Sequence, residues 1–294
     1  MYYRRKILLS LLQVFDNKLE KISLQKLLML FSDLQSRPDF HFVPYKLGCF
    51  SFQARADLST MVKYRQVAEE GNYWQKTDQA DYITELKESD RKAMRTIKNL
   101  YVGKSKDELL RITYTRFPYF ALNSTIAHEV LNESEINIVS NMRPKFKNSV
   151  LFTIGYEGVS LEEYLNKLII NGVNMLCDVR KNSLSMKYGF SKSQLKNACE
   201  GVGIQYEHIP DLGIESDKRQ ELHSQADYDI LFRQYRNEIL TKTHTQQEHI
   251  LELLKTNKRI ALTCFEANIY QCHRKHLAEA ITNIPGFNYE LRHI

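Results

Sequence analysis

The chain has 294 residues, of which 43% are hydrophobic and 26% are charged, and its formal net charge is +6. This length allows two domains with a core each, and the composition is that of a soluble globular protein. No apolar run approaches the roughly 18–20 residues that a bilayer-spanning helix needs, so we expect no membrane segment. The five cysteines are spread out and the basic, apolar start lacks a signal-peptide cleavage site. We therefore expect reduced thiols in a cytoplasmic protein.

The positive charge lies in the first half of the chain. Residues 1–150 contain 24 Lys and Arg against 17 Asp and Glu, whereas residues 151–294 contain 17 against 18. A basic surplus of this kind can attract DNA or RNA, although an ordinary solvated surface gives the same count.

The first half begins with helical periodicity. Apolar residues recur at helical spacing in 7–15 and again in 22–30, and Ser23 is placed to cap the second helix. A strand, a turn at Gly48, another helix and a strand around Tyr73 should follow. This order is that of a winged helix, and a small helical packing module without DNA contact would have the same pattern.

The polar segment 132–149 contains a proline and a basic cluster, and the pattern changes abruptly after it. We therefore predict a mainly α, winged-helix-like domain at 1–132, a linker at 133–149 and a second domain at 150–294.

In the second half, apolar strands alternate with amphipathic helices. This alternation predicts parallel βαβ crossovers and an open, mostly parallel α/β sheet with flanking helices. Ser160 and Glu163 have the spacing of a capping box at the start of the first helix. Strands are expected near 150–158, 174–180, 204–210 and 259–266, with an edge strand at 288–294.

Polar residues collect at the predicted carboxyl ends of these strands, where ligands bind in open α/β sheets. Asp178 and Arg180 close the second strand in a half whose strand interiors carry almost no charge, although they could also form a structural ion pair. The remaining strand-end and helix-start residues are Tyr156, Glu157, His208, Cys264, Glu266, Cys272, His273 and Arg274.

The segment "CFEANIYQCHRKH" allows several interpretations. As a zinc site its cysteine spacing is weak, so we predict no metal and no cofactor. At a helix start beside Arg274, Cys272 could have a lowered pKa and act as a nucleophile. The same helix start could bind an anion, or the cysteines could be small buried residues. Tyr270 stands six residues after Cys264, where rhodaneses and tyrosine phosphatases of this architecture have arginine, so those activities are disfavoured.

Both halves resemble known families. The "ISLQKLLMLF" and "YKLGCFSFQARADLSTM" segments are similar to winged-helix and antitoxin-like domains, with Cys49 where proline is usual. Residues 150–294 resemble domain-of-unknown-function family 488 through "TIGY", "DVR", "FSK", "HIPDLG" and "CFE…CHR". Ser183 and Met186 replace the family's usual proline and arginine. The resemblance implies a rhodanese-like α/β fold and no established reaction.

We assign candidate roles on this basis. The candidate catalytic residues are Asp178, Cys272, His208 and Glu266. The candidate substrate- or anion-binding residues are Tyr156, Glu157, Arg180, Ser185, Lys192, His273 and Arg274.

Two functions follow as expectations. One is an enzyme that acts on nucleic acid or on a nucleotide-like anion, with the basic first half delivering the site to DNA or RNA. The other is a non-catalytic DNA-binding regulator whose α/β half senses a small ligand or mediates oligomerisation. A protein partner for the first half is open in both cases.

Overall fold

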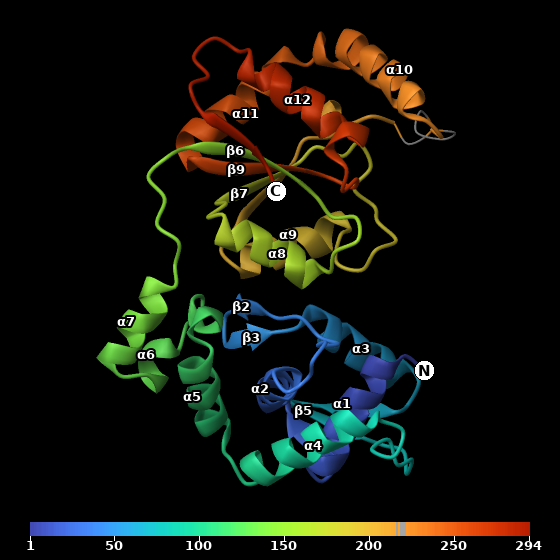
Figure 1. Ribbon diagram of the computed structural model, residues 1–294, viewed down its shortest axis with the longest axis vertical. Coiled ribbons are helices and arrows are strands. Elements are labelled where there is room, and N and C mark those ends of the chain that lie inside the picture. Colours follow the sequence, from blue (N-terminus) through green and yellow to red (C-terminus); the bar gives the residue numbers. More distant parts are fainter. Residues whose placement is uncertain (216, 218–221) are drawn as a thin grey trace. The chain divides into compact units, whose positions relative to one another are not determined.

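The computed structural model describes residues 1–215, 217 and 222–294. Contacts within the chain define two compact units, Met1–Arg143 and Pro144–Ile294 (Figure 1). Part of the predicted linker is helical, because Glu133–Asn141 form α7, which Asn132 and Glu135 cap reciprocally. In the part of the chain described here, no helix is both long and apolar enough to cross a membrane.

The first unit is mainly helical, with five short strands between its helices. In chain order its elements are α1 (Tyr3–Val14), β1 (Lys18–Glu20), α2 (Lys21–Ser32), β2 (Val43–Tyr45), β3 (Gly48–Phe50), α3 (Phe52–Lys63), β4 (Val67–Glu70), β5 (Tyr73–Lys76), α4 (Glu88–Tyr101), α5 (Lys106–Arg116), η1 (Pro118–Ala121), α6 (Ala127–Val130) and α7 (Glu133–Asn141).

The apolar stripes of α1 and α2 form the centre of this unit's core. Leu8, Leu12, Leu24 and Leu28 are almost completely buried there, as the helical periodicity predicts. The prediction that Ser23 caps the second helix is wrong. The helix begins earlier, at Lys21, and Ser23 is buried inside it.

Two small antiparallel sheets accompany these helices. Strands β1, β5 and β4 form a three-stranded sheet in that order, and β2 pairs with β3. The turn at Gly48 requires glycine, because its φ is +86° and a Cβ would lie 2.3 Å from the ring of Tyr114.

The second unit alternates strands and helices as predicted. Its elements are β6 (Val150–Gly155), α8 (Leu161–Ile170), β7 (Met175–Asp178), α9 (Lys192–Gly201), β8 (Gln205–His208), η2 (Pro210–Leu212), α10 (Gln225–Tyr235), η4 (Arg236–Leu240), α11 (His244–Asn257), β9 (Arg259–Cys264), η5 (Ile269–Gln271), α12 (His273–Thr282) and β10 (Glu290–His293).

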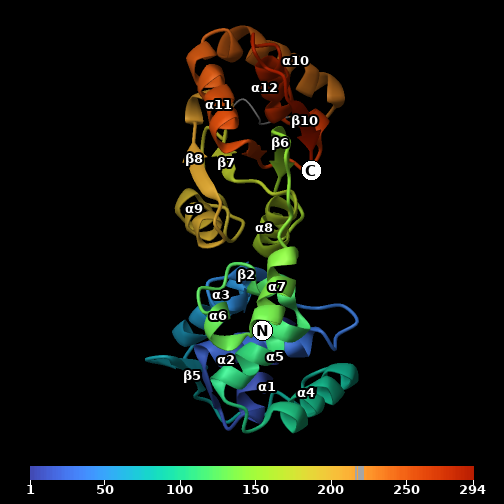
Figure 2. The same cartoon turned by 90° about the vertical axis from the view of Figure 1, so that its left-hand side faces the viewer.

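The five strands form one parallel sheet in the order β10-β6-β9-β7-β8. The α/β class is therefore confirmed, and β10 is an edge strand as expected. Figure 2 shows β8 and β10 at opposite sides of this unit. The crossover after β6 leads past β9 to β7, whereas the one after β9 leads past β6 to β10. Crossovers that leave neighbouring strands in opposite directions open a crevice at the carboxyl ends, where ligands bind in such sheets.

Helices cover both faces of this sheet. Helices α8 and α9 lie on one face and α10, α11 and α12 on the other (Figure 1). The core under the latter helices includes Cys177, Leu262, Leu254 and Leu277. Helix α8 begins with the predicted capping box, in which the backbone N–H of Glu163 donates to Ser160 Oγ at 3.2 Å.

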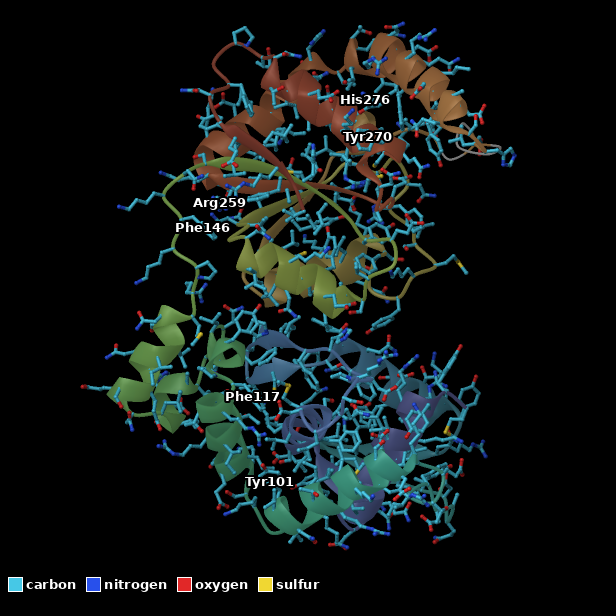
Figure 3. All side chains as sticks on the ribbon, in the orientation of Figure 1. Tyr101, Phe117, Phe146, Arg259, Tyr270 and His276 are labelled. Atoms are coloured by element: carbon cyan, nitrogen blue, oxygen red, sulfur yellow. The ribbon has the colours of Figure 1, made fainter. Side chains whose placement is uncertain are left out.

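The start of the second unit is held by Arg259. Its guanidinium carbon lies 3.8 Å from the ring centroid of Phe146 (Figure 3), and its Nη1 donates to the carbonyl of Asn148 at 3.0 Å. The Nε donates to the carbonyl of Asn171 at 3.0 Å. One arginine thus ties the segment before β6 to the first residue of β9.

Candidate functional site

The register of the sheet brings the predicted polar residues to one edge. Gly155 pairs with Cys264, and Asp178 pairs with both Thr263 and His208. The residues that follow or end β6, β9, β7 and β8 are therefore neighbours, as expected for the carboxyl ends of parallel strands.

Asp178 and Arg180 form a buried, two-point ion pair. Arg180 Nε donates to Asp178 Oδ1 at 2.8 Å and Nη2 donates to Oδ2 at 2.5 Å, and both residues are at most 5% exposed. Arg180 Nη1 donates to the phenol oxygen of Tyr156 at 2.7 Å and to the carbonyl of Phe190 at 2.9 Å. Burial acts to lower the pKa of Arg180, but the Asp178 carboxylate outweighs it and raises that pKa.

A second group from β8 supports this pair. The phenol of Tyr206 donates to Asp178 Oδ2 at 2.7 Å. Burial, followed by the nearby Asp178 carboxylate, raises the pKa of Tyr206, so its phenol stays protonated. His208 Nε2 lies 2.8 Å from the carbonyl of Arg180 and donates to it, because a carbonyl can only accept. Among the described residues, this bond rather than one to Asp178 orients His208.

Three side chains behind the pair form a thiol–imidazole cluster, which consists of Cys264, Cys272 and His273. All three are at most 1% exposed, and their sulfur and nitrogen atoms lie within 4.8 Å of one another. Cys264 Sγ lies 3.6 Å from His273 Nδ1, and His273 Nε2 lies 3.0 Å from the carbonyl of Val179.

The structure corrects the predicted pKa of Cys272. Burial, with the neighbouring Cys264 as the next cause, raises the pKa of this thiol well above its ordinary value, and the positive charge of Arg274 only partly opposes this shift. The residue does precede α12, as expected, but its complete burial outweighs the helix start. A solvent-accessible thiolate is therefore not what this environment favours.

Arg274 holds the loop that follows β9. It is 2% exposed, and its guanidinium donates to the carbonyls of Glu266 at 2.5 Å and Ala267 at 3.3 Å. Gly155 lets this loop approach β6, because a Cβ there would lie only 2.0 Å from the carbonyl oxygen of Glu266. The backbone N–H of Ala267 also donates to Glu157 Oε2 at 3.0 Å.

A pocket of about 560 Å³ opens in front of these groups. Of the predicted residues, Tyr156, Arg180, Ser185 and Glu266 line it, together with Cys264. The other predicted residues lie outside its lining. The pocket is completed by residues that sequence reasoning did not assign to the site: Lys181, Asn182, Leu184, Met186, Lys187, Ile214 and Phe265.

Two lysines of this lining were missed by the sequence analysis. Lys187 Nζ donates to the carbonyl of Tyr156 at 2.6 Å, and burial lowers the pKa of this lysine. Lys181 Nζ lies 3.7 Å from the carboxylate of Glu215. Both follow the "DVR" strand end in the chain. Their place just after a candidate strand end is the sequence signal that could have revealed them. They add positive charge to the lining beside Arg180.

The second unit is an α/β domain with a parallel sheet, and cationic and thiol side chains lie at the carboxyl ends of its strands. The family model of a domain of unknown function, DUF488, matches residues 160–281 of this chain. The match supports the resemblance predicted for the C-terminal half and covers less than half of the whole chain. No curated protein and no solved structure matches the chain.

Proposed function

We propose that the protein acts on nucleic acid or on a nucleotide, and that the strand-end pocket of the α/β unit binds a phosphate group of that ligand. The observation that carries this proposal is the charge of the lining. The described lining residues include three cations, Arg180, Lys181 and Lys187, and one carboxylate, that of Glu266. A pocket of about 560 Å³ has the size of small-molecule sites.

The roles within the pocket follow from the contacts. Lys181 and Lys187 are the lining cations to which we assign contact with a phosphate, while Ser185 and Asn182 offer neutral hydrogen-bonding groups. Arg180 is fixed by Asp178 and contributes its charge from a set position. Glu266 is the lining carboxylate to which we assign proton transfer.

The first unit supports the nucleic-acid part of the proposal. Helix α3 is followed by the β4–β5 hairpin, which is the order of a recognition helix and a wing. Arg55, Ser59 and Lys63 are exposed and four residues apart, so they share one face of α3. Two cations at this spacing suit contacts with DNA phosphates.

The pocket is tested with inorganic pyrophosphate as the probe, by calorimetric titration of the full chain. We expect the double variant Lys181→Gln/Lys187→Gln to bind at least tenfold more weakly than the wild type. The control is Lys167→Gln/Lys196→Gln, which removes the same charge from exposed positions of α8 and α9. Equal affinities for the two double variants would show that the pocket does not bind the probe.

The DNA surface is tested by measuring duplex affinity across salt concentrations. Arg55→Gln/Lys63→Gln should weaken binding and reduce the slope of log affinity against log salt by about two, since each lost phosphate contact removes roughly 0.9. Arg95→Gln/Lys98→Gln on α4 removes the same charge from another exposed position and should leave the slope unchanged. The same slope in both variants would argue against α3.

A non-catalytic regulator is a second candidate, favoured by the internal hydrogen bonds of Asp178 and Arg180 and by the burial of Cys272. In that case pyrophosphate in the pocket changes DNA affinity without being consumed. This candidate would be favoured over the enzyme if pyrophosphate no longer changed the DNA affinity of Lys181→Gln/Lys187→Gln and the wild type turned over no phosphate ester.

The proposal includes a cytoplasmic location. Each of the five cysteines is a free, buried thiol, which fits a reducing compartment.

A further inference from the structure

The thiol–imidazole cluster has the composition and spacing of a metal site. Tetrahedral zinc with Zn–S bonds of about 2.3 Å and a Zn–N bond of about 2.0–2.1 Å holds sulfur and nitrogen ligands about 3.5 Å apart. The distance between Cys264 Sγ and His273 Nδ1 is 3.6 Å, and one ligand atom from each of Cys264, Cys272 and His273 lies within 4.8 Å of the other two. Small side-chain shifts would bring these three ligand atoms to the separations that they have around a zinc ion.

The hydrogen bond of His273 selects the nitrogen that faces the thiols. Because Nε2 lies 3.0 Å from the carbonyl oxygen of Val179, Nε2 carries the proton. Nδ1 therefore presents its lone pair towards Cys264 Sγ. Metal-binding histidines are oriented in this way, with the other ring N–H donating to a carbonyl or carboxylate.

One member of the cluster borders the pocket. Cys264 lines it, whereas Cys272 and His273 are buried and do not belong to its lining. Glu266 Oε2 is 3.2 Å from Cys264 Sγ, yet this carboxylate is outside the group of three mutually close ligands. A site with three protein ligands, one open position and an adjacent carboxylate is the arrangement of catalytic zinc centres.

We propose that the second unit binds one Zn²⁺ through Cys264 Sγ, Cys272 Sγ and His273 Nδ1, with the fourth position open to the pocket beside Glu266. Two thiolates and one imidazole are ligands that favour zinc over magnesium or calcium. The two thiolates neutralise the charge of the ion. The residue that follows His273 in the chain is Arg274, whose guanidinium is buried. The weak spacing of the cysteines in sequence concealed this cluster, because strand end and helix start meet only in the fold.

This inference goes beyond the proposed function and stands without it. The zinc site concerns the ligands behind the pocket, whereas phosphate binding concerns the lysines in front. Zinc binding with no pyrophosphate binding would overturn only the proposed function. Pyrophosphate binding by a wild-type chain that retains no zinc after incubation with Zn²⁺ and dialysis would overturn only the present inference.

The test is the zinc content of the full chain, purified without a histidine tag, incubated with Zn²⁺ and dialysed. Elemental analysis should find about one zinc per wild-type chain and at least tenfold less in Cys264→Ser, Cys272→Ser and His273→Gln. Cys199→Ser is the matched control, since Cys199 is equally buried but lies in α9. It should keep the wild-type zinc content.

Because a cluster variant could lose zinc by failing to fold, the wild type is also loaded with Co²⁺. A thiolate-to-cobalt charge-transfer band in the wild type and in Cys199→Ser is expected, together with the release of about two thiol protons per metal ion. A wild type that holds no zinc after dialysis would overturn the proposal. So would a cobalt spectrum without the thiolate band, or cluster variants that retain as much zinc as Cys199→Ser.

Discussion

The guanidinium of Arg180 is held by several hydrogen bonds. It donates to the carboxylate of Asp178, to the phenol oxygen of Tyr156 and to the carbonyl of Phe190. A buried charge of this kind is tolerated because its partner and its hydrogen bonds replace water. The pair therefore supports the site chiefly by fixing the positions of Tyr156 and of the strand end.

Substitution of Asp178 should show how strongly the folded state depends on the ion pair with Arg180. Asp178→Asn leaves the Arg180 guanidinium buried without its counter-charge, and we expect the free energy of unfolding to fall by about 3–5 kcal/mol. Tyr206→Phe removes one hydrogen bond and leaves the ion pair, so its expected loss is about 1–2 kcal/mol. Urea denaturation measures both values. Equal losses would mean that the charge pairing of Asp178 contributes little.

His276 should make stability depend on pH. Burial, followed by the nearby Arg236, lowers the pKa of His276 below its ordinary value of 6.5, and Arg236 Nη1 lies 3.1 Å from His276 Nδ1. The unfolded chain therefore binds a proton that the folded chain resists. The contribution is complete above about pH 6.5 and is lost as the pH falls towards the lowered pKa.

Denaturation at pH 7.5 and 5.5 checks this effect. His276→Gln should reduce the loss of stability between the two values, because it removes the group that titrates. His128→Gln, at an exposed position of α6, should keep the wild-type loss. An unchanged loss in His276→Gln would contradict the assignment.

Single residues were predictable where their type was rare for their position. Asp178 and Arg180 stood out because charged groups seldom end apolar strands. Tyr206 has a common residue type at an ordinary position, so only the fold reveals that it faces the site, whereas the place of Lys181 and Lys187 just after a candidate strand end could have indicated them. The pKa of Cys272 was mispredicted because a helix start suggests exposure, whereas the burial of that start depends on the loop after β9.

Among the elements, the loop after β9 depends on Gly155 in β6. A Cβ at this position would lie 2.0 Å from the Glu266 carbonyl and 3.2 Å from the Cα of Ala267. Both atoms belong to backbone and cannot turn away as a side chain would. The loop that carries Glu266 is therefore positioned by the absence of one methyl group.

Gly155→Ala should displace this loop. We expect a loss of about 1–3 kcal/mol in the free energy of unfolding, which is typical of an overpacked site, and weaker binding of pyrophosphate. Ala261→Gly in the neighbouring β9 is the control, because it changes a strand residue by one methyl group. It should reduce stability without changing pyrophosphate affinity under conditions in which the variant is fully folded. Wild-type affinity in Gly155→Ala would contradict the role of the loop.

Elements with a strong pattern were predicted well. The strands β6, β7 and β9 are apolar runs next to capped helices, and the box of Ser160 and Glu163 marks the start of α8. The strands β1 and β3 have three residues each, so they are too short for an alternating pattern to appear. Their pairing depends on contacts with distant segments, as the register of Lys18 with Gln75 illustrates.

At the scale of the whole molecule, the division of contacts at Arg143 and Pro144 predicts two autonomous units. Residues 1–143 and 144–294, produced separately, should each unfold cooperatively, and residues 1–143 should retain the duplex affinity of the full chain. Thermal unfolding and the salt-dependent DNA titration check this expectation. Retention of DNA by residues 144–294 alone would assign the nucleic-acid surface to the other unit.

Anomalous diffraction can show whether the strand-end pocket binds a phosphate group. Crystals of the full chain grown with tungstate, an electron-dense phosphate mimic, would be measured at the tungsten absorption edge. We expect a tungsten peak within hydrogen-bonding reach of Lys181 and Lys187, next to Arg180 and Ser185. Ordered tungstate elsewhere on the protein, with none in this pocket, would contradict it.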